Sequence, residues 1–306
     1  MKRYAAIDIG TNSVLLLVAE QTEAGGFKAV QERAEITRLG RGVDASKTLS
    51  AEGMKVTVDA VTAFVNEARA LKVADIAITA TSAARDASNG KTFLELVLKS
   101  TGLAVDIISG DDEARLSFLS AFADFGATKP LVVIDIGGGS TEFIFGNPDG
   151  SIAFKKSFDV GSVRLTERLL RSDPPTDAEL AAARAHLKQL FAELSQSSGT
   201  HTMIGIAGTV TTLLSIAERM EPYDPARVHG ATLTAARITE LTQQLTRQTT
   251  EQRKQLPGLQ PKRADVIAAG ALVLDEAMCA LKQSSLIVSD RGLRWGLLTD
   301  RFGGRS

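Results

Sequence analysis

The chain carries the heptapeptide IDIGTNS at residues 7–13 and repeats it as IDIGGGS at residues 134–140. Both copies follow the pattern I-D-I-G-x-x-S, and such internal similarity is the first feature to seek in a sequence. Apolar runs precede and follow each copy, as at residues 4–7 and 14–19 around the first one. Each copy therefore predicts a tight turn between two antiparallel strands.

The surroundings of the two turns repeat as well. After the first turn the hydrophobic patterns predict a strand at 27–38, a helix at 50–71 capped by Ser50, a strand at 76–80, a helix at 91–101, a strand at 105–108 and a helix at 110–122. After the second turn they predict a strand at 151–159, helices at 161–170 and 176–195, a strand at 203–207, a helix at 209–220, helices within 234–280, a strand at 285–289 and a terminal helix.

This order predicts an α/β fold made of two ribonuclease H-like halves, as in the actin, Hsp70 and sugar-kinase superfamily, with a cleft between two domains. A chain of 306 residues is long enough for two domains. The polar stretch GATKP at 126–130 predicts the boundary, which gives an amino-terminal domain at 1–125 and a carboxy-terminal domain with extra helices at 126–306.

Composition excludes several classes of protein. A formal net charge of −1 gives no overall attraction to nucleic acid, and no apolar run approaches the roughly 20 residues that span a bilayer. The amino terminus lacks a secretory signal, so we expect a cytoplasmic protein without a membrane segment. The lone Cys279 is expected to be a small core residue.

The glycine-rich second turn is typical of a phosphate-binding loop. Gly137, Gly138 and Gly139 have no side chains, so their backbone N–H groups can approach an anion, and Ser140 and Thr141 add hydroxyl donors. If the two halves face each other across a cleft, the two turns converge on the same phosphate.

Two carboxylates flank this turn. Asp135 ends one strand and Glu142 opens the next, so we expect both at one end of the sheet, where they can hold a metal ion. Hard oxygen ligands, few of them from the protein, suit Mg²⁺. Asp8 is the matching carboxylate of the first half and is predicted either to join the metal site or to orient backbone groups.

Two further segments are candidates for binding and catalysis. The run GIAGTVTT at 205–212 places Gly208 at the end of a strand and Thr209 at the start of a helix, where free N–H groups attract anions; ordinary capping by threonine is the alternative. Glu113 lies in an acidic cluster in the first turn of the helix at 110–122, which is a common place for carboxylates that only complement the helix dipole.

Taken together, the segments resemble the exopolyphosphatase/guanosine pentaphosphate phosphatase family. The matching segments run in family order from residue 4 to about residue 299. Sugar kinases, Hsp70 and actin share the hairpin turns but not the segments TSAAR at 81–85 and SGDDEAR at 109–115, so the match is specific. The matching segments are residues 7–13, ATSAAR at 80–85, ISGDDEAR at 108–115, residues 134–142, residues 205–212 and LIVSDRGLR at 286–294.

The resemblance implies a metal-dependent phosphohydrolase that releases terminal orthophosphate from inorganic polyphosphate, guanosine pentaphosphate or both, acts with Mg²⁺ or Mn²⁺, and forms a homodimer. It implies that Glu113 is the catalytic carboxylate that activates water and that Asp135 and Glu142 bind the metal. It further implies that Arg85 and Arg263 contact phosphates. The residues expected to complete the phosphate cradle are Thr11, Asn12, Ser13, Gly137, Gly138, Gly139, Ser140, Thr141, Gly208 and Thr209.

The chain departs from the family pattern in places. Members often carry Ser-Val-Arg where this chain has Leu15 after Ser13 and Val14, so one phosphate-binding arginine is missing and the affinity for substrate or the preferred chain length is expected to differ. The usual Glu-Glu pair becomes Asp112-Glu113, which keeps the second carboxylate. The chain stops at Ser306, where longer members add a helical domain, so processive handling of long polyphosphate is expected to be reduced.

Two other functions are open at this stage. The shared turns also suit a kinase or ATPase, which the consumption of ATP would reveal, although no adenosine pocket is evident in the sequence. The missing arginine at Leu15 also fits a non-catalytic sensor that binds guanosine tetraphosphate or pentaphosphate and signals nutrient stress, and tight binding without phosphate release would identify it.

Overall fold

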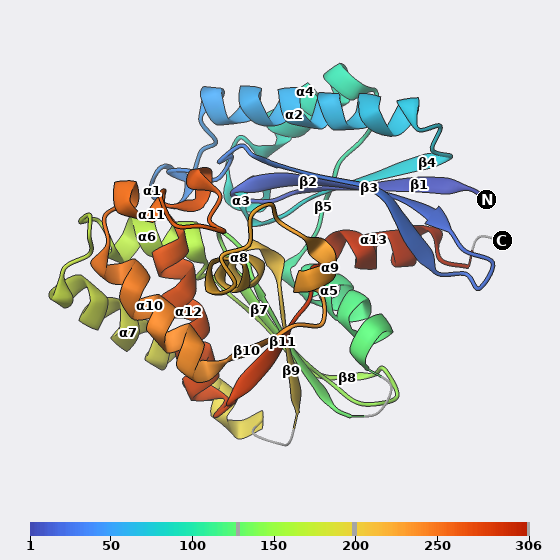
Figure 1. Cartoon of the computed structure of the whole chain (residues 1–306). Helices are drawn as coiled ribbons and strands as arrows, with labels where there is room; N and C mark the ends of the chain where they lie inside the picture. Colours follow the sequence, from blue (N-terminus) through green and yellow to red (C-terminus); the bar gives the residue numbers. More distant parts are fainter. Residues whose placement is uncertain (127–128, 198–200, 305–306) are drawn as a thin grey trace. The chain divides into compact units, whose positions relative to one another are not determined.

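The structure, a computed structural model, describes residues 1–126, 129–197 and 201–304 and comprises two compact units (Figure 1). Unit 1 is Met1–Ser120 together with the segment from Gly292 onward, and unit 2 is Ala121–Arg291. The chain therefore first passes between the units a few residues before the GATKP stretch, of which Ala127 and Thr128 lie outside the described residues.

The carboxy-terminal segment joins unit 1, although the sequence analysis assigned it to the second domain. Its helix α13 (Leu293–Phe302) packs against the first strand of unit 1, where the rings of Tyr4 and Phe302 stack with centroids 4.4 Å apart. Arg294 donates from Nη1 to the carbonyl of Leu16 at 2.8 Å. These contacts explain the difference, because chain order alone does not reveal where a terminal helix packs.

Over the described residues unit 1 has a five-stranded sheet in the order β3-β2-β1-β4-β5. β1 pairs antiparallel with β2 and parallel with β4, β2 pairs antiparallel with β3, and β4 pairs parallel with β5. The bounds are β1 (Arg3–Ile9), β2 (Ser13–Gln21), β3 (Phe27–Ile36), α1 (Val43–Ser46), α2 (Ala51–Ala70), β4 (Asp75–Ala80), α3 (Ser82–Asp86), α4 (Gly90–Thr101), β5 (Asp106–Ile107) and α5 (Gly110–Phe125).

Helices cover both faces of this sheet. Figure 1 shows α2 and α4 on one side and α13 on the other. Ile7, Leu16 and Phe93 belong to the core under α2 and α4, whereas Tyr4 and Leu17, at alternate strand positions, face α13. Burying each such side chain contributes about 1.5–3 kcal/mol. The hydroxyl of Ser50 accepts from the N–H of Gly53, so the predicted cap of α2 is confirmed.

Unit 2 repeats this arrangement. Its sheet has six strands among the described residues, in the order β10-β11-β9-β6-β7-β8. The bounds are β6 (Leu131–Ile136), β7 (Thr141–Gly146), β8 (Ile152–Phe158), α6 (Ser162–Leu169), α7 (Asp177–Phe191), η1 (Ala192–Ser197), β9 (Thr202–Ile206), α8 (Ala207–Ala217), α9 (Pro225–Val228), β10 (Thr232–Thr234), α10 (Ala235–Arg247), α11 (Thr250–Arg253), η2 (Pro261–Arg263), α12 (Ile267–Ala280) and β11 (Ser285–Val288).

The strand pairing shows that the duplication is real. β6, β7 and β8 form an antiparallel set, while β9 runs parallel to β6 and β11 runs parallel to β9. This is the order of unit 1 with β10 added at one edge by antiparallel pairing with β11. The predicted α/β fold of two ribonuclease H-like halves is therefore confirmed. The sequence patterns did not predict β10 or the short helices α1, α3 and α9.

Two local expectations need comment. Cys279 lies on α12, a helix otherwise buried over most of its length, but its own side chain is exposed, so the expectation of a core cysteine was wrong. No helix in the described ranges combines the length and apolarity that a membrane crossing requires.

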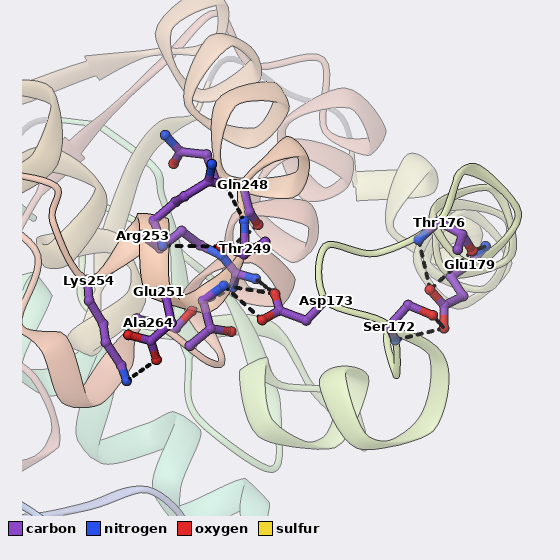
Figure 2. A network of polar contacts seen from close by, with 12 residues as sticks. Ser172, Asp173, Thr176, Glu179, Gln248, Thr249, Glu251, Arg253, Lys254 and Ala264 are labelled. Atoms are coloured by element: carbon purple, nitrogen blue, oxygen red, sulfur yellow. Dashed lines mark hydrogen bonds and ion pairs between the residues drawn. The ribbon is translucent and has the colours of Figure 1, made fainter.

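The start of α7 carries a complete capping box. Thr176 accepts from the N–H of Glu179, and the carboxylate of Glu179 accepts in return from the N–H of Thr176 at 2.8 Å (Figure 2). The same carboxylate accepts from the N–H groups of Arg171 and Ser172. The hydrogen bond from Thr176, followed by those from Ser172, lowers the pKa of Glu179 to about 2.

We expect Glu179→Gln to lower the Tm at neutral pH. Because the folded state depresses the pKa of Glu179 below its ordinary 4.5, the carboxylate contributes stability above that value and loses it as the pH falls toward 2. The difference in Tm between wild type and variant should shrink steadily between about pH 5 and pH 3. A Tm difference that stays constant over this range contradicts the assignment.

Candidate active site

The first turn, between β1 and β2, is held by the chain that follows β3. Gly10 donates to the carbonyl of Ser13 at 2.9 Å, which closes the turn. The carbonyl of Thr11 accepts from the N–H of Gly40, and that of Asn12 accepts from the N–H groups of Thr37 and Arg38. The turn carbonyls are thus fixed by neighbouring backbone, and the conformation of the turn is set before any ligand binds.

Two side chains of this turn are buried. Thr11 Oγ1 lies 2.8 Å from Ser82 Oγ at the start of α3, so the turn and the α3 amino terminus are held together. Asn12 is 8% exposed, and within the described chain its Nδ2 has no hydrogen-bond partner. A buried amide donor without a partner is costly, and an anion bound at the turn would satisfy it.

Arg85 and Glu113 lie together in unit 1. Arg85 is the penultimate residue of α3, which follows β4, and Glu113 lies in the first turn of α5, which follows β5. Arg85 Nη1 donates to the carbonyl of Ile108 at 2.8 Å and lies 3.5 Å from Glu113 Oε2. Glu113 is 8% exposed. The predicted catalytic carboxylate and a predicted phosphate-binding arginine thus lie side by side, on helices that follow the neighbouring parallel strands β4 and β5.

Asp8 and Leu15 occupy paired positions on β1 and β2. The equivalent positions of unit 2 hold Asp135 and Glu142, which are paired in the same way on β6 and β7. The two halves therefore share a backbone frame but differ chemically at this site. The second half carries two carboxylates, whereas the first half carries one carboxylate and a leucine.

The glycine turn of unit 2 is held by the start of α6. The carbonyl of Gly137 accepts from the N–H of Ser162, and the carbonyl of Gly138 accepts from the N–H groups of Val163 and Arg164. The carbonyl of Gly139 accepts from Nε of Arg164 at 2.8 Å. Three successive carbonyls are thus bound by one helix start.

The hydrogen bonds that α6 donates to the carbonyls of the glycine turn also orient the N–H groups of the same peptides. In a planar trans peptide the N–H points opposite to the C=O, so the N–H groups of Gly138, Gly139 and Ser140 point away from α6. Among the backbone–backbone hydrogen bonds of the described residues, none has the N–H of Gly138 or Gly139 as donor. Successive outward amides of this kind form an anion cradle.

The close approach of α6 requires a glycine at position 161. A Cβ built on Gly161 would lie 2.6 Å from the carbonyl oxygen of Gly138 and 2.7 Å from that of Gly137. Real Cβ atoms do not come so near backbone oxygens, so any side chain here would push the turn out of place.

Asp135 and Glu142 have the chemistry of a divalent-metal site. Directly opposed residues in an antiparallel pair have their Cβ atoms about 4.5–5.5 Å apart, on one face of the sheet. Glu142 is fully buried and its Oε1 accepts from Ser157 Oγ at 2.7 Å, while Asp135 is 7% exposed. The donor set is all oxygen, which fits Mg²⁺ or Mn²⁺.

No group of three or more histidine, cysteine, aspartate or glutamate side chains among the described residues is arranged to hold a metal ion. The two carboxylates of unit 2 would therefore need water or substrate oxygens to complete a coordination sphere, as is usual for Mg²⁺. The participation of Asp8, which lies in unit 1, remains a prediction.

The third loop joins β9 to α8. The helix begins at Ala207, two residues earlier than the sequence predicted, and Ala207 has φ of 67°, a left-handed conformation that costs energy for a residue with a Cβ. A Cβ built on Gly270 of α12 would lie 2.6 Å from Thr209 Cγ2 and 3.4 Å from Ser162 Cβ. The starts of α8 and α6 are thus close neighbours, and α6 connects them to the glycine turn.

Arg263 lies against the same loop. A Cβ built on Gly208 would lie 2.7 Å from Cζ of Arg263, so the guanidinium packs directly on this glycine. Among the described residues the Arg263 side chain has no hydrogen bond or ion pair. Desolvation lowers the pKa of Arg263, and an electrostatic interaction with Tyr223 partly offsets this by raising it. Arg263 is half-buried, and a phosphate bound at this loop would give its guanidinium the charged hydrogen-bond partner that it lacks among the described residues.

Two clusters result, each within one unit. In unit 1 the structure brings Thr11 close to α3 and Arg85 close to Glu113. In unit 2 it brings the glycine turn close to the Gly208–Thr209 loop and Arg263 onto that loop. Four residues that build these clusters were not among the predicted site residues, namely Ser82, Gly161, Ser162 and Arg164. A glycine and a serine between a predicted strand and a predicted helix, Gly161-Ser162, could have indicated the start of α6, but no sequence pattern indicated Arg164.

Comparisons with known proteins agree with this architecture. Residues 17–303 match the Ppx/GppA phosphatase family. The chain is 36% identical to Exopolyphosphatase 2 of Mycobacterium tuberculosis, with 99% of both chains covered. It is 33% identical to a Fusobacterium nucleatum bifunctional 3-dehydroquinate synthase/phosphatase, covering 97% of this chain and 46% of that protein.

Solved structures give the same result. The crystal structure of the Aquifex aeolicus member of the Ppx/GppA family matches with 34% identity and a TM-score of 0.81, covering 98% of this chain and 97% of that one. An exopolyphosphatase from Cytophaga hutchinsonii matches with 25% identity and a TM-score of 0.89, covering 98% and 97% of the two chains. This chain belongs to the Ppx/GppA phosphatase family.

Proposed function

We propose that the chain hydrolyses inorganic polyphosphate from its end and releases orthophosphate, with guanosine pentaphosphate as a second substrate. The observation that carries the proposal is the glycine turn whose three carbonyls are bound by α6, because it presents successive amides to an anion. Relatives named exopolyphosphatase over nearly the whole chain support the choice of polyphosphate.

The candidate groups of the two units have different roles in this reaction. In unit 2 the amides of Gly138, Gly139 and Ser140, together with Arg263, bind phosphate oxygens and stabilise the negative charge that develops on them. In unit 1 Asn12 Nδ2 and the Arg85 guanidinium bind further oxygens, and the carboxylate of Glu113 accepts the proton of the attacking water. Residues Thr11, Ser13, Thr141, Gly208 and Thr209 complete the two phosphate-binding clusters.

The reaction is a hydrolysis and needs no co-reactant other than water. The water oxygen bonds to the terminal phosphorus, the bond from that phosphorus to the bridging oxygen breaks, and the bridging oxygen leaves with the shortened chain. Glu113 takes a proton from the water and can return one to the products. Asp135 and Glu142 would hold Mg²⁺ or Mn²⁺, which when bound neutralises charge on the phosphates.

The first experiment measures phosphate release from long polyphosphate, tripolyphosphate, guanosine pentaphosphate and ATP, each with Mg²⁺, with Mn²⁺ and with chelator. Metal-dependent release from polyphosphate, with little from ATP, is the expected result. Turnover of ATP alone would favour a kinase or ATPase, and binding of guanosine pentaphosphate without release would favour a sensor. A cytoplasmic location, expected from the amino-terminal sequence, and a homodimer, implied by the family resemblance, remain predictions, and light scattering tests the second.

A further inference from the structure

The segment that carries Arg263 is anchored by a buried arginine (Figure 2). Arg253, the last residue of α11, is 3% exposed and donates from Nη1 to the carbonyl of Ala264 at 2.5 Å. Its Nε donates to the carbonyl of Gln248 at 3.2 Å. Because Ala264 directly follows Arg263, the contact with Arg253 fixes the peptide beside the phosphate-binding candidate.

Asp173 neutralises Arg253 and also holds α11. Its Oδ1 lies 3.0 Å from Arg253 Nη2, and both carboxylate oxygens accept from the N–H of Thr250, at 2.8 and 3.0 Å. Burial lowers the pKa of Arg253, and the charge and hydrogen bond of Asp173 oppose that effect. The buried arginine is thus paired on one side with a carboxylate and on the other with backbone carbonyls.

The position of Arg263 depends on its backbone. Its guanidinium packs on Gly208, and its side chain makes no hydrogen bond or ion pair within the parts of the chain that the structure describes. Since no hydrogen bond or ion pair with the described residues orients the Arg263 side chain, it stays over the loop only while the peptide at Ala264 stays in place. A misplacement of about 1 Å at a binding group can cost up to about 10²-fold in rate.

The anchoring residues also connect to the glycine turn. Asp173 lies four residues beyond the end of α6, and the start of α6 binds the carbonyls of Gly137, Gly138 and Gly139. One eight-residue helix therefore links the two phosphate-binding features of unit 2: its first turn orients the amides, and the segment after its last turn holds the arginine.

We propose that Asp173 and Arg253 form a positioning pair that fixes the Arg263 guanidinium over the Gly208–Thr209 loop for a phosphate group of the substrate. The inference rests on the proposed function, since it concerns the same phosphate-binding site. Neither residue touches substrate, so both act through Arg263.

A double-mutant cycle tests this relay. Asp173→Asn in the wild-type background is expected to raise the KM for polyphosphate, and the Kd for inorganic tripolyphosphate measured calorimetrically with chelator, about tenfold, as for other residues that orient a binding group. The kcat should change much less. In an Arg263→Met background, Asp173→Asn should weaken binding no further, because the group it positions is gone.

Conservative and control variants complete the design. Asp173→Glu keeps the charge and should recover part of the affinity, and Arg253→Met should repeat the effect of Asp173→Asn. Lys254→Met is the control, because Lys254 neighbours Arg253 but its ion pair among the described residues is with the exposed Glu251, at 2.6 Å. This variant should bind tripolyphosphate like the wild type. Circular dichroism and Tm identify variants that fail to fold. If Asp173→Asn fails to fold, Asp173→Glu replaces it in the cycle, and its smaller loss of affinity should likewise disappear in the Arg263→Met background.

The outcomes separate the two proposals. A wild type that neither binds tripolyphosphate nor releases phosphate from polyphosphate overturns the proposed function and this inference with it. An active wild type in which the losses from Asp173→Asn and Arg263→Met multiply, or in which Asp173→Asn lowers kcat with KM unchanged, overturns the positioning pair alone.

Discussion

Glu113→Gln is expected to lower the kcat for phosphate release by about 10²–10⁴-fold while leaving the binding of tripolyphosphate close to that of the wild type. The amide has nearly the shape of the carboxylate but cannot accept the proton of water. Its oxygen can still accept from Arg85, which lies 3.5 Å from Glu113 Oε2 and is held independently by the carbonyl of Ile108. The arginine should therefore keep its place, and the loss should appear in turnover and not in affinity.

The matched control is Asp111→Asn, which removes one carboxylate from the same first turn of α5 at an exposed position. Like Glu113→Gln, it removes a negative charge that interacts with the dipole of α5. That interaction contributes only about 0.3–1 kcal/mol. Asp111→Asn should retain most of the wild-type kcat. Full turnover by Glu113→Gln would show that another group accepts the proton.

Gly161→Ala is expected to lower kcat/KM by about 10²–10³-fold, the loss that follows removal of one preorganised backbone or side-chain donor in comparable sites. The new Cβ would lie 2.6 and 2.7 Å from the carbonyl oxygens of Gly138 and Gly137, so either α6 or the turn must move. Gly161 has φ of −155°, an extended conformation that alanine adopts freely, so the penalty comes from lack of space alone. Movement of the carbonyls rotates the opposed N–H groups away from the phosphate.

Gly26→Ala serves as the control for this variant. It adds the same methyl group in the β2–β3 turn, where the new Cβ would lie at an ordinary contact distance of 3.5 Å from Thr22 Oγ1. Its phosphate release should equal that of the wild type. Gly161→Ala with wild-type kcat/KM and unchanged Tm would mean that the amides do not need α6 to hold them.

The frame of the fold could be predicted because it depends on local patterns. The repeated heptapeptide that begins with IDIG and the alternation of strands and helices can both be recognised in short stretches of sequence. The elements predicted from these stretches agree with the strand order that the structure shows. The opposition of Asp135 and Glu142 also follows locally, since a turn of four residues sets the register of the hairpin.

Other features depend on which distant segments pack together, and short windows carry no such information. The return of α13 to unit 1 rests on the stacking of Phe302 on Tyr4 across nearly the whole chain. The binding of the turn carbonyls by α6 and the contact of Arg263 with Gly208 also join segments separated by more than twenty residues. The role of Arg164 was therefore invisible in the sequence, while that of Arg263 was available only through the family resemblance.

The exposed Cys279 gives the chain a single site for thiol-directed labelling, because it is the only cysteine in the sequence. It lies on α12 nine residues after Gly270, which packs against Thr209, so a fluorophore there would lie about 14 Å along the helix from the phosphate-binding loop. Although the side chain is exposed, partial desolvation of the thiol by its neighbours, followed by the charges of Asp275 and Glu276, raises the pKa of Cys279. Conjugation should accordingly be slow at neutral pH and faster in mildly alkaline buffer. A fluorophore attached to Cys279 could therefore be used to follow substrate binding without an engineered cysteine.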